Sequence, residues 1–178
     1  MKRKAARKKP PAKRTAARKK KARKARPIPP GYRSVTAYLS VRGAARAIEF
    51  YTQAFGAEET LRLPGAEGKI GHAEIRIGDS LVMLSDEYEA MGFLSPQGRG
   101  GSSVHLHLYV RDVDATVARA TAAGAKITRP VEDQFYGDRR GTLEDPYGHV
   151  WHVATHTEDP SDAEVKRRLR EIAKKALG

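Results

Sequence analysis

The sequence predicts one α+β domain built from two copies of a βαβββ unit, whose curved mixed sheets pair around a cavity. Three observations lead to this fold class. The 178 residues suffice for one domain with a core. Apolar residues first alternate as in a strand and then recur at helical spacing. The same pattern returns when the sequence is shifted by 69 positions, as expected of an internal repeat.

The first unit, residues 34–86, begins with a predicted strand over 35–41, where apolar and polar residues alternate. A helix follows, and Gly56 suits its left-handed C-cap. Strands are predicted near 58–64, 69–77 and 80–85, the last two joined by the hairpin signal Gly78-Asp79. The apolar residues of the predicted helix are Ala44, Ala47, Ile48, Tyr51 and Phe55.

The second unit, residues 103–155, repeats the pattern with a strand over 103–110, a helix over 112–123 and closing strands up to 154. The shift places Val35 on Val104 and Ile48 on Val117. A segment rich in Gly and Ser, residues 97–103, joins the units. Because a sheet with a helix on one face leaves its other face uncovered, each unit supplies the other with a partner. The predicted domain spans residues 31–157.

Alternation assigns the residues of the first strand of each unit to two faces. The polar alternates should face the cavity, which suggests a ligand site there. The predicted cavity-facing residues are Thr36, Tyr38, Ser40, His105, His107 and Tyr109, and the predicted helix-facing residues are Val35, Ala37, Leu39, Val104, Leu106 and Leu108.

Residues 1–30 hold 15 of the 34 Lys and Arg residues and no acidic residue, which leaves residues 31–178 with a net charge of −2. Such a segment buries too little apolar surface to fold, so it is predicted to be a disordered tail with a stiff Pro-rich linker over 26–31. Nonspecific contact with DNA, RNA or anionic lipid fits its charge. A mitochondrial presequence fits less well, and a solvated tail or an upstream start codon is the alternative. The tail residues singled out are Lys8, Lys9, Lys19, Lys20, Lys21, Arg23 and Lys24.

The chain has no cysteine, which excludes disulfides and thiolate metal sites. No apolar run approaches the roughly 20 residues of a membrane span, and no secretory h-region is present. We therefore expect a cytoplasmic protein, nucleoid-associated if the tail contacts chromosomal DNA. Residues 158–178 are predicted to form a C-terminal helix with capping-box spacing at Ser161 and Glu164. Its narrow apolar stripe is expected to dock on the domain or on a second subunit, and comprises Val165, Leu169 and Ile172.

Several motifs together resemble the PhnB-like branch of the vicinal oxygen chelate superfamily, which has the glyoxalase/bleomycin-resistance/dihydroxybiphenyl dioxygenase fold. These motifs are Val35-Thr-Ala-Tyr-Leu-Ser-Val, Ala47-Ile-Glu-Phe-Tyr, Gly71-His-Ala-Glu-Ile, Tyr136-Gly-Asp-Arg and Asp145-Pro-Tyr-Gly-His-Val-Trp. The resemblance covers residues 34–157 and implies the fold and a homodimer. It does not fix the activity, because such proteins include isomerases, ring-cleaving dioxygenases, antibiotic-modifying transferases and drug-sequestering proteins.

In metal-dependent members, which the chain resembles, the ligands fall on the first and last strand of each unit, here on Thr36, Met83, His105 and His152. The two imidazoles suit Zn, Ni, Mn or Fe, whereas Thr and Met are poor ligands for a divalent ion. Glu74 is a candidate carboxylate, which would complete a two-His one-carboxylate set and is the candidate catalytic group. One hypothesis is therefore metal-dependent lyase, isomerase or dioxygenase chemistry.

The alternative hypothesis is a metal-free protein that binds a small molecule or drug, with Tyr38, Met83 and Tyr109 on the cavity wall. Arg139, oriented by Asp138, could hold an anionic ligand, and a salt bridge across the sheet or a dimer contact is the equal alternative. The remaining histidines are further candidates, although such residues are more often hydrogen-bonded wall residues. They are His72, His107 and His149, while Tyr147 and Trp151 are expected in the core.

Overall fold

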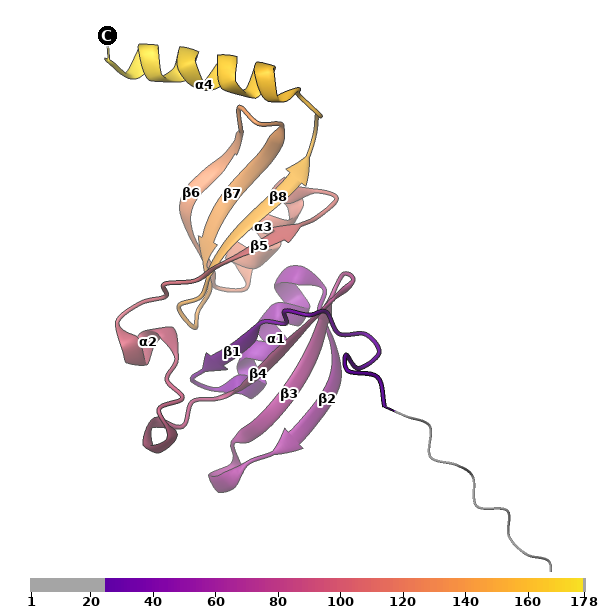
Figure 1. The fold of residues 1–178 in the computed structure, drawn as a ribbon. Helices are drawn as coiled ribbons and strands as arrows, with labels where there is room; N and C mark the ends of the chain where they lie inside the picture. Colours follow the sequence, from indigo (N-terminus) through magenta and orange to yellow (C-terminus); the bar gives the residue numbers. More distant parts are fainter. Residues whose placement is uncertain (1–24, 178) are drawn as a thin grey trace, which may run out of the picture.

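The computed structural model describes residues 25–177. The basic residues singled out in the predicted tail, Lys8 to Lys24, lie outside the described residues. Within the described part, two four-stranded mixed sheets each carry one long helix, in the order expected of paired βαβββ units (Figure 1). The predicted fold class is confirmed. No helix among residues 25–177 combines the length and the apolar character needed to cross a bilayer.

The two sheets have equivalent strand orders, β1-β4-β3-β2 and β5-β8-β7-β6, and in each the first strand runs parallel to the last. The first unit consists of β1 (Tyr38–Val41), α1 (Ala44–Phe55), β2 (Glu58–Pro64), the short η1 (Ala66–Gly68), β3 (Ile70–Ile77) and β4 (Ser80–Asp86). The second consists of β5 (His105–Tyr109), α3 (Val113–Ala122), β6 (Lys126–Asp133), β7 (Asp138–Glu144) and β8 (Val150–His156).

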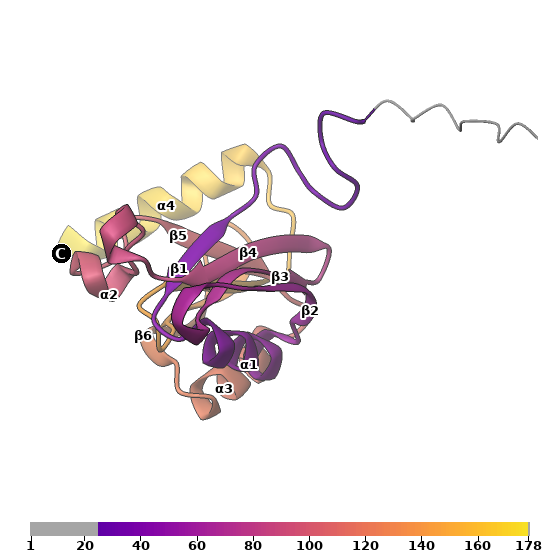
Figure 2. The ribbon, with the colours of Figure 1, turned by 90° about the horizontal axis from the view of Figure 1, so that it is seen from below.

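Helices α1 and α3 lie side by side, so that the two units share one apolar core (Figure 2). The core residues of each unit sit on the inner side of the helix and on the helix-facing side of the sheet. Tyr51, Leu84, Leu143 and Val153 are fully buried in it. Because the helices cover only one face of each sheet, the opposite faces remain for a ligand or a partner.

At the N-terminus of each long helix, backbone N–H groups donate hydrogen bonds to a side chain from the last strand of the same unit. The Asp86 carboxylate accepts the backbone N–H groups of Gly43 and Ala44 at 2.9 Å each and that of Ile70 at 2.8 Å. In the second unit Thr155, 69 residues later, accepts the N–H of Val113 at 2.9 Å. These contacts satisfy donors that a helix start leaves free. The sequence repeat therefore extends to the way each helix is anchored.

The first strand of each unit is shorter than predicted. β1 begins at Tyr38, and Val35, expected to face the helix, is 87% exposed. Val104 at the equivalent place is 66% exposed. In the second unit the partner strand sets this limit, because β5 begins at His105, opposite Val150, the first residue of β8. In the first unit the ladder begins with the Met83 N–H donating to the Ala37 carbonyl, and the residues before Ala37 leave the sheet although β4 itself starts at Ser80.

The connection between the units is more ordered than its Gly and Ser content suggested. It contains η2 (Glu89–Met91) and α2 (Pro96–Arg99). Ser95 is the N-cap of α2, with its hydroxyl accepting the Gly98 N–H at 3.2 Å. Because Ser95 is fully buried, this turn is fixed against the domain.

The C-terminal helix α4 (Asp162–Leu177) extends past the end of the second sheet (Figure 1). Its expected cap is present, since Ser161 Oγ accepts the Glu164 N–H at 3.3 Å. Arg168 joins the helix to Glu158 through an ion pair. Val165 at the start of the apolar stripe is partly buried, whereas Leu169 and Ile172 are each 49% exposed, so most of the stripe is left uncovered in the single chain. A second subunit remains the alternative that the sequence raised.

Candidate functional site

Two predicted metal ligands come together on the face of the second sheet that is turned away from α3. His105 Nδ1 lies 3.1 Å from His152 Nε2. The parallel pairing of β5 with β8 sets this distance, because it places His107 directly opposite His152 and His105 one step along the same face. Alternation along β5 then adds Tyr109 to the same face, where its ring lies 4.6 Å from that of His107.

A polar surface surrounds the two imidazoles. Thr142 Oγ1 lies 3.0 Å from His152 Nδ1 and fixes the ring orientation. Burial, then the charge of Arg140 and the neighbouring imidazoles, lower the pKa of His152. Burial also lowers the pKa of His107, an effect that the charge of Asp138 opposes and that of Arg140 reinforces. The lowered pKa values of His107 and His152 favour the neutral form of these two imidazoles. We call this surface the histidine face, formed by His105, His107, Tyr109, Arg140, Thr142 and His152.

The donor set does not fit a resident divalent metal ion. Two imidazoles that share a tetrahedral ion lie about 3.3 Å apart, so the observed separation alone would allow one. Such ions, however, take three or four protein ligands. Within residues 25–177 no group of three His, Asp or Glu residues is arranged to hold one. The other repeat-related positions carry Thr36 and Met83, whose side chains bind such ions weakly.

The candidate carboxylate Glu74 lies on β3 of the first sheet and is engaged there. It accepts a hydrogen bond from the Tyr32 hydroxyl and lies 3.4 Å from His72 Nε2. His72 Nδ1 in turn lies 3.1 Å from the Tyr38 hydroxyl. The structure thus places Glu74 in a Tyr-His-Glu chain of its own sheet and does not join it to His105 and His152.

The remaining wall residues lie on an open surface in the single chain. Thr36 precedes β1, and its hydroxyl lies 3.4 Å from the carbonyl of Arg33. Met83 is paired with Tyr38 on one side and with Glu74 on the other. Tyr38 is 41% exposed and Tyr109 is 61% exposed. A ligand held on these faces would be enclosed only if something else covered them.

Arg139 does not line this surface. Its guanidinium donates to both carboxylate oxygens of Asp114 at 2.8 Å and to Asp133 at 3.1 Å. Asp138 does not orient it and instead contacts the Tyr109 hydroxyl at 3.1 Å and His156 Nδ1 at 2.8 Å.

Side-chain alternation along β7 explains the difference, since the cross-strand pair of Thr142 and His152 puts the even-numbered residues on the histidine face. Arg140, the other arginine of the Gly137-Asp138-Arg139-Arg140 segment, is thus the arginine of that face, and the choice of Arg139 was wrong. The Arg-Arg pair was visible in the sequence. The strand register that decides between Arg139 and Arg140 could not be predicted from the sequence.

The Asp145-Pro-Tyr-Gly-His motif has a structural role. The buried Asp145 carboxylate accepts four hydrogen bonds, from the Tyr51 hydroxyl at 2.7 Å and from Trp151 Nε1 and the backbone N–H groups of Tyr147 and His149 at 2.9 Å each. Tyr147 and Trp151 are buried, as expected. Because Tyr51 belongs to α1, this carboxylate ties the two units together.

Comparison with known proteins agrees with the repeat architecture. The model of the glyoxalase/bleomycin resistance protein/dioxygenase superfamily matches residues 34–153. An uncharacterized protein of Mycobacterium tuberculosis is 40% identical over 139 residues, covering 76% of this chain and 82% of that protein. The crystal structure of TioX from Micromonospora sp. ML1 is 31% identical with a TM-score of 0.53, covering 68% of this chain and 96% of TioX. A PhnB protein from Bacillus cereus, 22% identical over 69% of this chain and 99% of its own, shares the fold with a TM-score of 0.55.

Proposed function

The chain belongs to the glyoxalase/bleomycin resistance protein/dioxygenase superfamily, and from this premise we propose that it binds a small, oxygen-rich molecule on the histidine face without a resident metal ion. The observation that carries the proposal is the set of three imidazoles beside Arg140, with only two imidazoles in reach of a shared ion. A neutral imidazole both donates and accepts a hydrogen bond. Arg140 adds a fixed positive charge suited to a carboxylate or phenolate oxygen.

We also propose that a second copy of the chain covers the open sheet faces. The polar faces of both sheets are exposed in the single chain, and a ligand pocket normally buries most of its ligand. A homodimer would supply the missing wall, and the exposed stripe of α4 offers further apolar surface for it.

A ligand screen on chelator-treated protein tests the proposed function. Small carboxylates and phenols would be ranked by the rise in melting temperature of the wild type and of the double variant His105→Ala/His152→Ala. We expect compounds that stabilise the wild type in the presence of EDTA and lose at least about tenfold in affinity in the double variant. His72→Ala, on the other sheet, is the matched control. Compounds that bind the double variant equally well would contradict the proposal.

Metal-dependent lyase, isomerase or dioxygenase chemistry is the second candidate, favoured by one observation. The separation of 3.1 Å between His105 and His152 is close to that of two imidazoles on one ion. A metal of the Zn, Ni, Mn or Fe type would then have to complete its coordination with water or substrate. Turnover that requires both histidines and vanishes with chelator would support this candidate against the first.

The tail gives a separate proposal, that the basic segment holds the domain on nucleic acid. It rests on the 15 basic and no acidic residues among residues 1–30. Binding of this kind releases counterions and weakens steeply with salt. Deleting residues 2–26 should abolish salt-sensitive retention on a DNA column and leave the melting temperature of the domain unchanged. Retention that survives the deletion would show that the tail is not the contact.

A further inference from the structure

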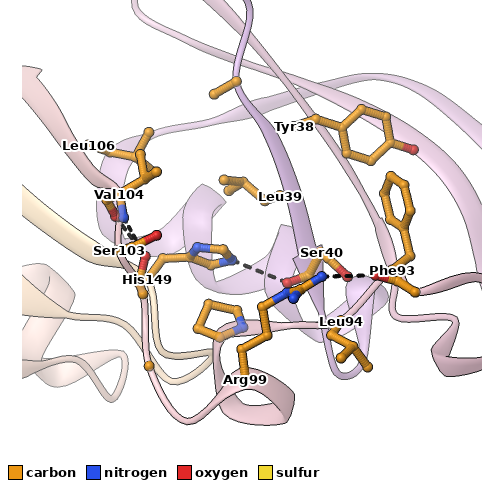
Figure 3. Close-up of a pocket in the computed structure, with 15 residues that line it drawn as sticks. Tyr38, Leu39, Ser40, Phe93, Leu94, Arg99, Ser103, Val104, Leu106 and His149 are labelled. Atoms are coloured by element: carbon orange, nitrogen blue, oxygen red, sulfur yellow. Dashed lines mark hydrogen bonds between the residues drawn. The ribbon is translucent and has the colours of Figure 1, made fainter.

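We propose a second ligand site, which takes an amphipathic anion with an apolar body and one carboxylate or sulfonate group. The site lies between the two units, beneath residues 87–104, which connect the units and which we call the linker in this subsection. The site is a cavity of about 390 Å³, within the size range of small-molecule pockets (Figure 3). Residues 37–40, in and just before β1, the linker and the start of β5 line it, with His149 from the turn before β8. It is distinct from the histidine face, none of whose members line it.

Linker residues 92–99 cover this cavity, and we call them its roof; they are held against the first unit by side-chain contacts. The Glu87 carboxylate accepts the backbone N–H of Ser95 at 3.0 Å and its hydroxyl at 2.7 Å. Arg42 forms an ion pair with the same carboxylate. Phe93 packs edge-on against Tyr38 with ring centroids 5.6 Å apart. Folding of the chain therefore shapes the roof before any ligand arrives.

The roof is also fixed to the second unit. Gln97 Nε2 donates to the carbonyl of Pro146 at 2.8 Å. Gly148, with a φ of +85°, allows the turn before β8 to approach α2 closely, since a Cβ there would lie 3.0 Å from Cβ of Pro96. Contacts with both units hold the cavity open between them, and such preorganisation lowers the entropic cost of binding.

The chemistry of the interior defines the ligand class. Most of the wall is apolar, with Leu39, Leu94 and Leu106 among its members. Arg99 is the one charged side chain among the lining residues, none of which is acidic. Within residues 25–177 the Arg99 guanidinium donates a hydrogen bond to the Gly92 carbonyl at 3.0 Å. This contact uses one of its five N–H donors. An anionic group at Arg99 and an apolar body along the leucines match this arrangement.

Two polar groups lie at the inner end. Ser40 Oγ is buried and has no hydrogen-bond partner within the described residues. His149 Nε2 lies 3.3 Å from the Ser40 carbonyl, and the ring faces the cavity in Figure 3. Because a buried hydroxyl without a partner is unfavourable, a ligand atom that bonded it would gain affinity.

The repeat supplies an internal comparison. The shift of 69 positions carries Ser40 to Tyr109 and relates His149 to Ser80, and both Tyr109 and Ser80 line a cavity at the opposite end of the seam. That cavity has Arg119 and Arg111 together with acidic residues, Asp79 and Asp112, and none of linker residues 87–104. The linker thus contributes a wall to only one of the two repeat-related cavities.

Fluorescence with a matched pair of probes tests the proposal on the full chain. Anilinonaphthalene sulfonate has an apolar body and one anionic group, and N-phenylnaphthylamine lacks the anionic group. We expect saturable binding of the sulfonate at one site per chain, weakened about tenfold by Arg99→Met. The uncharged probe should bind the wild type and Arg99→Met equally. Arg119→Met, in the repeat-related second cavity, is the matched control and should leave both affinities unchanged.

The variant His105→Ala/His152→Ala separates this proposal from the proposed function, because it should leave the sulfonate affinity unchanged. An unchanged sulfonate affinity in Arg99→Met would overturn the proposal, as would an equal loss in Arg119→Met. Loss of both probes in Arg99→Met with an unchanged melting temperature would also overturn it, because the charge would then not be the determinant.

Discussion

Replacing Asp145 with alanine is expected to lower the free energy of unfolding by about 3–5 kcal/mol. The carboxylate is 3% exposed and accepts four hydrogen bonds. Its loss leaves the Tyr51 hydroxyl and the Trp151 indole N–H without a partner in the core, together with two backbone donors. Urea unfolding followed by Trp151 fluorescence and by circular dichroism would measure the change.

The matched control is Tyr51→Phe, which removes one of the four donors and keeps the ring in place. We expect it to cost about 1–2 kcal/mol, because only one hydrogen bond is lost while the carboxylate keeps the others. An Asp145→Ala variant within about 0.5 kcal/mol of the wild type would show that the two units are not joined through this carboxylate.

Asp86→Ala should have the second largest effect, a loss of about 2–4 kcal/mol. This carboxylate, 9% exposed, accepts two N–H groups at the start of α1 and a third from Ile70. The repeat offers an internal control in Thr155→Ala, which removes one contact at the start of α3 and should cost about 1 kcal/mol. Denaturant unfolding of both variants checks the order, and an equal or larger loss in Thr155→Ala would contradict the account.

Much of the fold could be predicted from the sequence because its periodicities are local. The spacing of apolar residues located the four strands of the first unit, the first strand of the second and both long helices of the domain, and the shift by 69 positions identified the repeat. The other three strands of the second unit were predicted only as a group that ends near residue 154. The ends of the first strands were not predictable in this way. Val35 continues the alternating pattern, but it lies outside the ladder between β1 and β4 and is exposed.

The site was predicted less completely, since it depends on register between strands. His105 and His152 are related by the repeat to positions 36 and 83, which identified them as a pair. The choice between Arg139 and Arg140 required the pairing of β7 with β8, where one step reverses the face. Long-range contacts of Glu74 with Tyr32 were likewise invisible to local patterns.

The motifs with the strongest family resemblance proved to be structural. Phe-Tyr at residues 50–51 and Asp-Pro-Tyr-Gly-His at residues 145–149 meet at the Asp145 carboxylate, in the core between the units. They therefore specify chiefly how the two halves pack. The residues that face the ligand surfaces lie outside those two motifs, apart from His149.

Metal content of tagless protein, measured by mass spectrometry, tests the central claim most directly. The wild type and His105→Ala/His152→Ala would be purified in parallel from cells grown with Zn, Ni, Mn and Fe supplied. Because two imidazoles alone bind a divalent ion weakly, we predict far less than one metal ion per chain in both proteins. About one metal ion per wild-type chain, lost in the double variant, would contradict the account and establish a metal centre on the histidine face.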